Sequence, residues 1–218
     1  MKKIIIIFLF AFASSVYSQY DFTLGMGIDF NSTPSFRDYI NSNYARGVDN
    51  LSTFKTSVSF SGEVGYDIKD NIQLAFEYNI LLDSYNQSIG PGGSYELSYI
   101  SHRPSIIAYY VIKGDGYKFK FGGGAGLRYV SLDEKLFVTT NYTTNGYGVL
   151  LKAEGNTLLS GNLFANIGVS LRYDTPGSPK NNSIGFIYDP VAKESLNLNS
   201  VSVGIKIGIS YSIYRSIN

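Results

Sequence analysis

His102 is the only histidine of the chain, and its neighbours decide whether it could take part in catalysis. A histidine acts as a general base when a serine or an acid lies within hydrogen-bond reach. Ser98 and Glu96 lie four and six residues before His102, on the same face of an alternating segment. No nucleophile lies two residues away, and Pro104 disturbs the spacing. We therefore expect no catalytic site, and hydrolysis at a membrane is the least favoured function.

The sequence carries no pattern for a cofactor, a metal ion or a nucleic acid. With no Cys in the chain, disulfides and Cys-ligated metals are excluded. The run 122–126 lacks the glycine spacing of a phosphate loop and is better explained as small residues that let bulky neighbours fit. Asp and Asn residues in 174–199 lack EF-hand spacing. The 18 basic and 17 acidic residues nearly cancel, which argues against a nucleic-acid partner.

The informative charges lie on the polar face of alternating segments, away from most of their ends. This set contains Glu63, Glu77, Lys120, Arg128, Lys152, Glu154, Arg172 and Lys206. Three acids and five bases that share one narrow interior must pair with one another or find water. The favoured interpretation is a structural network of ion pairs that fills the interior. The alternative is a narrow, selective conduit.

The elements that position these charges are strands, because apolar and polar residues alternate nearly everywhere after residue 19. In the first strand Phe22, Leu24 and Met26 share one face, while Asp21 and Thr23 lie on the other. Eight such segments follow this pattern, and we expect no helix. The expected strands span about 21–30, 55–68, 72–82, 95–112, 117–129, 147–159, 163–173 and 201–213.

The segment 95–112 alternates least regularly. Its apolar residues predict an apolar face that contains Tyr99, Ile107, Tyr109 and Val111, and Arg103 would be the only charge to interrupt such a face in the whole chain. Pro104 has no backbone N–H to donate, so we expect a bulge or a local loss of pairing there.

Strand length and connections favour an eight-stranded antiparallel up-and-down transmembrane β-barrel. Most segments reach the ~9–11 residues that cross a bilayer, whereas strands of globular proteins average about 5–6. The connections alternate between tight turns near 68–72, 113–116 and 160–162 and long polar segments at 31–53, 83–94, 131–146 and 174–199. This asymmetry is typical of outer-membrane barrels, and an even strand number places both termini at the short-turn end.

Aromatic residues fall near both ends of the expected strands, as the two interfacial belts of such a barrel do. Near the short turns we place Tyr66, Tyr109, Tyr117, Phe119 and Tyr211, and near the long segments Phe30, Tyr78, Tyr129, Tyr147 and Tyr173.

The first residues have the pattern of an export signal. Lys2 and Lys3 precede the ten-residue apolar run 4–13, and the small residues Val16 and Ser18 fit a cleavage site before Gln19. Ten apolar residues are too few for a membrane helix, which needs about 20. We therefore predict a signal peptide at 1–18 and a barrel domain at 19–218.

Three stretches carry a resemblance to known families. The segments 99–110 and 120–127 resemble the proline-containing fourth strand and the glycine-rich fifth strand of the PorT-like family of small outer-membrane barrels. The segment 155–173 is similar to the sixth-to-seventh hairpin of that family and of OmpW-like barrels. The last strand, 206–213, resembles the C-terminal signal read by the outer-membrane assembly machinery, although it ends in Ile213 and five residues follow it. The resemblance implies location and fold, and it transfers no functional residue.

Together these patterns predict a monomer in the outer membrane of a bacterium, in contact with lipid and with the assembly machinery during biogenesis. The expected role is structural or surface interaction, with the long loops as contact surface toward a surface or periplasmic protein that the sequence does not name. The alternative is a passage for small solutes of the OmpW type. We expect no cofactor, no nucleic acid and no enzymatic activity.

Overall fold

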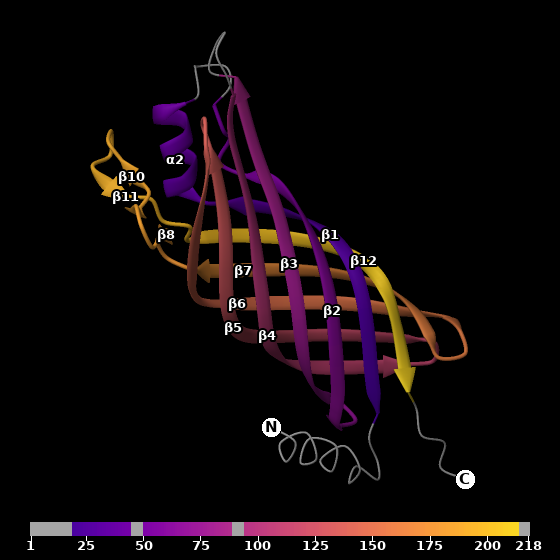
Figure 1. Ribbon diagram of the computed structural model, residues 1–218. Coiled ribbons are helices and arrows are strands. Elements are labelled where there is room, and N and C mark those ends of the chain that lie inside the picture. The colour runs from indigo at the N-terminus through magenta and orange to yellow at the C-terminus, as the bar shows by residue number, and fades with distance from the viewer. Residues whose placement is uncertain (1–18, 45–49, 89–93, 214–218) are drawn as a thin grey trace.

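Eight long antiparallel strands dominate the computed structural model, which describes residues 19–44, 50–88 and 94–213 (Figure 1). They are β1 (Tyr20–Ser32), β2 (Lys55–Lys69), β3 (Ile72–Ser88), β4 (Ser94–Gly114), β5 (Tyr117–Lys135), β6 (Thr139–Ser160), β7 (Leu163–Thr175) and β12 (Ser200–Ile213). The predicted signal peptide lies outside the described residues. Among those residues, none of the helical structure is long and apolar enough to cross a membrane.

The strands form a closed ring. Each pairs with its neighbours in the chain, β5 pairs with β6, and the first strand pairs with the last, from Tyr20 opposite Ile213 to Ser32 opposite Val201. Because the strand number is even, the start of β1 and the end of β12 lie at the same end as the tight turns. Gly116 and Gly161 occupy the left-handed region in two of these turns. The predicted all-β, eight-stranded barrel is confirmed.

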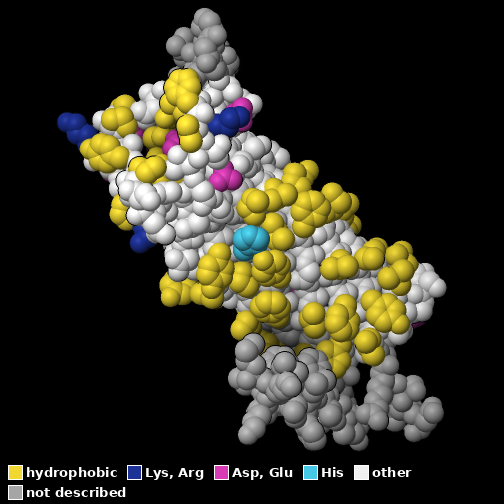
Figure 2. All heavy atoms as spheres, viewed as in Figure 1, with side chains coloured by type: hydrophobic (Ala, Val, Ile, Leu, Met, Phe, Trp, Pro, Cys, Tyr) yellow, Lys and Arg dark blue, Asp and Glu magenta, His cyan; other side chains and the backbone are white. Residues whose placement is uncertain are grey.

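The two faces of the wall differ as the alternation predicts. Outward side chains such as Leu24 and Ile167, 66% and 61% exposed, form a broad apolar surface around the barrel (Figure 2). Inward positions hold Ser, Asn, Asp, Glu, Lys and Arg, nearly all of them buried. An apolar outer wall around a polar interior is the arrangement of a barrel whose solvent is lipid.

The prediction of which face of β4 points inward was wrong. Ile107, Tyr109 and Val111 are buried inside the barrel, and Ile106, Tyr110 and Ile112 face outward instead. The segment is apolar on both faces around 106–112, so alternation alone could not distinguish them. Tyr99 also points inward, where its hydroxyl accepts a hydrogen bond from Asn31. Tyr109 is therefore not part of the aromatic belt near the short turns.

Two further expectations are corrected at the other end of the barrel. The described residues of 83–94 and most of 131–146 are strand, because β3, β4, β5 and β6 continue past the wall as a projecting sheet. The segment 31–53 contains a helix, α2 (Pro34–Asn43), where none was expected. Residues 174–199 form four two-residue strands, namely β8 (Lys180–Asn181), β9 (Gly185–Phe186), β10 (Tyr188–Asp189) and β11 (Glu194–Ser195).

These parts assemble a second core beyond the barrel, which we call the cap: α2, the projecting ends of β3–β6 and the segment 174–199. Its buried apolar side chains come from every part, and include Phe36, Tyr39, Ile40, Tyr85, Tyr95, Leu97, Val130, Leu132, Tyr142, Ile187, Leu196 and Leu198. Figure 1 shows α2 beside the projecting strands, above the mouth of the barrel. The long segments are therefore an ordered module rather than separate loops.

Candidate functional site

The structure brings the eight charged residues predicted from the sequence into one interior. Seven of them are buried, and the Lys206 side chain is only 12% exposed. Glu63 and Glu77 face each other directly across the β2–β3 pair. Two carboxylates this close repel unless a cation lies between them. Lys152 supplies that cation, with its Nζ 2.6 Å from Oε2 of each glutamate.

Four of the other five predicted residues extend this pair into a network. Lys120 Nζ lies 2.8 Å from both Glu63 and Glu154, and Lys152 also reaches Glu154 at 2.8 Å. Arg172 donates to Glu77 at 2.6 Å, and Lys206 lies 3.1 Å from Glu154. Every one of the three acids is thus held by at least two cations, as buried charges require.

Tyr109 joins the network because β4 points it inward. Its hydroxyl donates to Glu63 at 2.9 Å, and Lys120 Nζ lies 4.7 Å from the centre of its ring. The aromatic ring fits because β5 has Gly122 opposite, where a Cβ would come within 2.5 Å of it. The glycine-rich run of β5 therefore serves the close approach of β4, as small inward residues do.

Arg128 is not part of this network but belongs to a second cluster nearer the cap, whose other two members, Arg103 and Asp174, sequence reasoning missed. Arg103 lies 3.2 Å from Asp174, and Arg128 pairs with the same carboxylate. Arg103 was expected to interrupt the apolar face, and Asp174 was expected in a loop. Both point inward, so between Ser98 and Ile112 the outward face of β4 carries no Asp, Glu, Lys or Arg. Arg103 alternates with Ser101 and Ser105 on one face of β4, and this polar alternation could have indicated that Arg103 points inward.

Pro104 produces the local loss of pairing that the sequence allowed as one of two outcomes. The β4–β5 register passes from His102 opposite Tyr129 to Ser105 opposite Gly126 without a shift, so there is no bulge. Arg128 Nη1 donates to the carbonyl oxygen of Leu127 at 2.7 Å, which satisfies an acceptor near the proline.

At the short-turn end a further pair was also overlooked. Lys118 Nζ lies 2.8 Å from Asp21, and that carboxylate accepts hydrogen bonds from Gln73 and Ser212. Both residues lie near the ends of their strands, whereas the predicted set lies away from most strand ends. Charged groups consequently follow one another along the interior from the turns to the cap.

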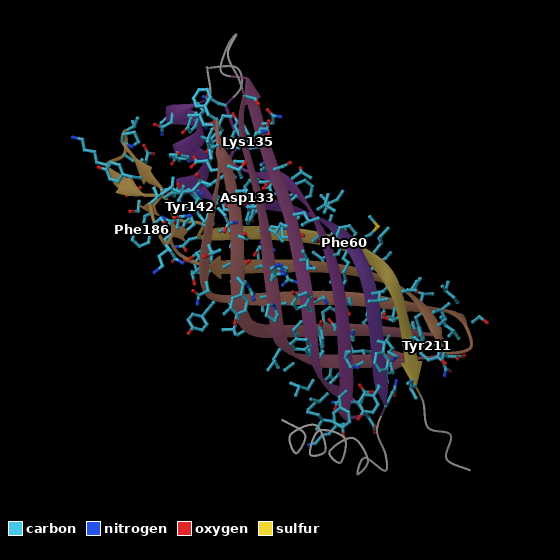
Figure 3. The ribbon with its side chains drawn as sticks, viewed as in Figure 1. Phe60, Asp133, Lys135, Tyr142, Phe186 and Tyr211 are labelled. Carbon is cyan, nitrogen blue, oxygen red and sulfur yellow. The ribbon has the colours of Figure 1, made fainter. Side chains whose placement is uncertain are left out.

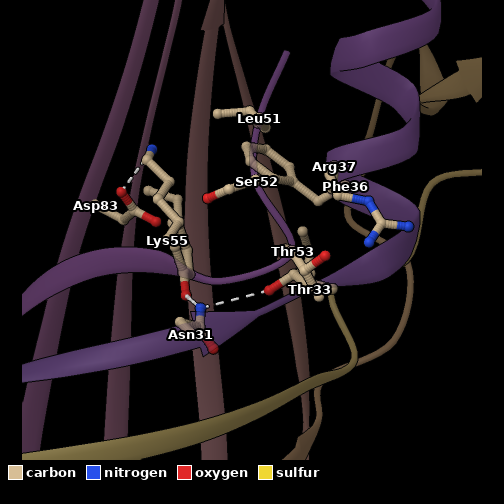
Figure 4. Close-up of a pocket in the computed structure, with 11 residues that line it drawn as sticks. Asn31, Thr33, Phe36, Arg37, Leu51, Ser52, Thr53, Lys55 and Asp83 are labelled. Carbon is tan, nitrogen blue, oxygen red and sulfur yellow. Dashed lines mark hydrogen bonds and ion pairs between the residues drawn. The ribbon is translucent and has the colours of Figure 1, made fainter.

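The interior leaves little free space. A cavity of about 10 Å³ lies beside Glu77, Arg172 and Lys206, roughly enough for one water molecule. A second pocket, of about 20 Å³, lies between α2 and the barrel mouth (Figure 4). The polar side chains that line it already interact with one another, since Lys55 pairs with Asp83 at 2.7 Å and Asn31 donates to Thr33 at 3.4 Å. Neither has room for a solute larger than water.

His102 points outward, among the apolar side chains of the wall (cyan in Figure 2). Its Nδ1 lies 2.8 Å from the hydroxyl oxygen of Tyr78, and in the described parts of the chain no other hydrogen bond reaches it. Glu96 is instead paired with Lys135 at 3.0 Å. The serine or acid that a hydrolase would need beside the histidine is not among its described partners.

The cap has its own polar contacts, which fasten α2 to the segment 174–199. Asn43 donates to Asp189 at 3.1 Å, and the backbone N–H of Asn197 donates to Ser35 at 3.1 Å. Burial opposes ionisation of Asp189, but hydrogen bonds from Asn43 and two backbone amides outweigh it and hold its pKa below the usual value.

Comparison with known proteins supports the fold. No protein-family model matches the chain, and no curated protein sequence matches it either, so the resemblance to the PorT-like and OmpW-like families stays a prediction. Among solved structures, a major outer membrane protein from Thermus thermophilus has a TM-score of 0.54 at 12% identity, covering 90% of this chain and 99% of that one.

Two further solved structures are similar to this chain. Ail, the attachment invasion locus protein of Yersinia pestis, also has a TM-score of 0.54, at 9% identity over 91% of this chain and 100% of that one. The outer membrane protease OmpT from Escherichia coli matches at a TM-score of 0.44 and 8% identity, over 92% of this chain and 98% of that one, which is too weak to carry a functional argument. The chain thus has the fold of the small β-barrels of bacterial outer membranes.

Proposed function

We propose that this protein is a closed, monomeric barrel of the outer membrane that presents its cap as a contact surface for another protein. The observation that carries the proposal is the ordered second core above the barrel. A pore needs a clear path, whereas here an apolar core covers the mouth and ion pairs occupy the interior. Loops that only connect strands have no need of a buried core of their own.

The membrane location rests on the apolar outer wall and on the fold. Outward Val, Ile, Leu and Phe side chains are exposed on all eight strands of the barrel, for example Ile28 and Val169, and such a surface is stable only against hydrocarbon. Contact with outer-membrane lipid follows from this, and insertion by the outer-membrane assembly machinery follows from the location. We propose no enzymatic activity, because His102 has only Tyr78 as a described partner.

A narrow passage of the OmpW type is the second candidate. It is favoured by polar atoms in the described interior that have no hydrogen-bond partner, among them Arg172 Nη1 and Asn79 Oδ1. Arg172, Asn79 and Lys206 line the 10 Å³ cavity, so a file of water could begin there. The closed interpretation is preferred because the cap would still cover the mouth.

Two measurements test the proposal. Because the chain has no Cys, a single Cys introduced at Asn181 or at Asp115 can be labelled with a membrane-impermeant maleimide on intact cells. We expect labelling at the cap position 181 and none at the turn position 115. In planar bilayers the purified protein should show no steady conductance. Label at 115 alone would reverse the topology, and robust selective conductance would promote the passage to first place.

A further inference from the structure

Glu134 is an acid of the cap that has no cation as a partner in the described part of the chain. It lies on the inward face of β5, in the projecting sheet, and its Oε1 accepts hydrogen bonds from Tyr39 at 2.8 Å and Tyr95 at 2.7 Å. Within the described ranges no Lys or Arg forms an ion pair with it. Of the neighbouring acids, Glu96 pairs with Lys135, whereas Asp133 is exposed on the other face of the sheet and accepts a hydrogen bond from Asn141 at 2.8 Å.

Tyrosines surround this carboxylate. Tyr44 stacks on Tyr95 with ring centres 3.7 Å apart, and it meets Tyr39 edge to face at 5.6 Å. Burial, with the negative charge of Glu134 as a further cause, raises the pKa of Tyr39, Tyr95 and Tyr142. The phenols therefore stay neutral at physiological pH, and Glu134 is the one described charge among these rings.

A half-buried carboxylate beside converging phenol hydroxyls is a chemical arrangement that attracts organic cations. The carboxylate supplies the charge, and the hydroxyl oxygens of Tyr39 and Tyr44, which lie 3.2 Å apart, can accept hydrogen bonds from an ammonium or guanidinium group. We propose that Glu134, with the tyrosines around it, binds the ammonium or guanidinium group of a basic peptide segment. This inference rests on the proposed contact role of the cap and names the chemistry of the partner.

The exposure and the position of Glu134 and Tyr44 allow a partner to reach this site. Tyr39 and Tyr95 are buried and fix Glu134 through their hydroxyls, whereas Glu134 and Tyr44 are only partly buried. Tyr44 ends α2, and Glu134 lies one residue before the end of β5, so the site is near the end of the projecting strands (Figure 1). A side chain from a partner can reach it there without opening the barrel.

Glu134→Gln and Asp133→Asn form a matched pair for the test. Each removes one negative charge at adjacent positions of β5, but Asp133 lies on the opposite, outer face of the sheet, beside Lys135 (Figure 3). The full chain is refolded in a non-ionic maltoside detergent, because alkylphosphocholine headgroups are themselves quaternary ammonium ions. Binding of fluorescently labelled lysine and arginine hexapeptides is followed by anisotropy, with a serine hexapeptide as control and tetramethylammonium chloride as competitor.

We expect both basic peptides to bind the unaltered chain and tetramethylammonium to compete. Glu134→Gln should weaken binding about tenfold, and Asp133→Asn should change it less than about twofold. Tyr44→Leu, which keeps an apolar side chain but removes the ring, gives a second variant and should also weaken binding. Its heat-dependent shift in gel migration reports whether the barrel is intact.

Three results would overturn the inference. Equal losses in Glu134→Gln and Asp133→Asn would mean nonspecific attraction to surface charge. Absence of binding to the unaltered chain would remove the site. A third variant, Arg46→Ala, removes a basic residue that lies two positions after Tyr44 and outside the described ranges. If the peptides bind only to this variant, Arg46 itself already occupies the site. In each case the labelling and conductance results stand on their own, so failure here leaves the proposed function to be judged separately.

Discussion

Glu63 and Glu77 lie directly opposite each other on neighbouring strands, and a single ammonium group, that of Lys152, bridges them. The two acids are tolerable in a narrow interior because β6 places a cation between them and because Lys120 and Arg172 also pair with Glu63 and Glu77. Buried charges that are paired in this way avoid the cost of an uncompensated charge.

The first prediction removes that cation. Lys152→Met leaves two facing carboxylates with fewer partners, and breaking a buried pair in this way costs about 3–5 kcal/mol. The exposed pair of Lys135 and Glu96 provides the control, because Lys135→Met should cost less than about 1 kcal/mol. Urea unfolding in detergent micelles measures both. A similar, small loss for the two variants would mean that the interior is wet enough to solvate its charges.

The sequence predicted this pair because its turn, near Asp70, fixes the hairpin register, and register determines which residues face each other. It predicted the barrel because apolar and polar residues alternate in nearly every strand. What the alternation of apolar residues alone could not supply was the orientation of β4, where Ile106 and Ile107 are equally apolar. There the choice depends on which side chain fits against Ala75 and Leu150, a tertiary contact.

The cap was missed for a different physical reason. The helix α2 has a Pro at its start, no acid in its first turn and no side-chain N-cap, so the usual local signals are weak. Its stability comes from packing, and the other buried residues of this core lie about 50 to 160 positions away in the chain. Arg103 and Asp174 meet only because β4 and β7 belong to the same ring.

A second prediction tests the register of β4. Ile107 is fully buried inside the barrel, so Ile107→Ala should cost about 2–5 kcal/mol by leaving a cavity. Ile106 is 59% exposed on the outer wall, and the same substitution there should cost far less. Unfolding midpoints of the two variants in one detergent give the comparison. If Ile106→Ala were the more damaging of the two, the orientation described for this strand would be wrong.

The third prediction concerns the cap as a separate cooperative unit. Ile40 is fully buried in the core of the cap, so Ile40→Ala should loosen the cap while the barrel stays folded. Limited proteolysis should then cut within 174–199 much faster than in the unaltered protein. The heat-dependent gel shift, which reports the barrel, should not change. Loss of both together would show that cap and barrel fold as one unit.

The last prediction compares two neighbours that face different solvents. Ile167 lies on the outer wall near the middle of β7, opposite Ile207, so an arginine there would face hydrocarbon. That substitution should cost about 2–4 kcal/mol at mid-bilayer depth. Asn166 points inward, where its side-chain amide donates to Asn156 at 2.9 Å, and a charge there would join other polar groups. Asn166→Lys should therefore fold into vesicles more readily than Ile167→Arg, as measured by the yield of the heat-modifiable form. Because the two positions are adjacent on one strand, strand propensity and distance from the turn are matched, and equal yields would contradict the assignment of the two faces to lipid and lumen.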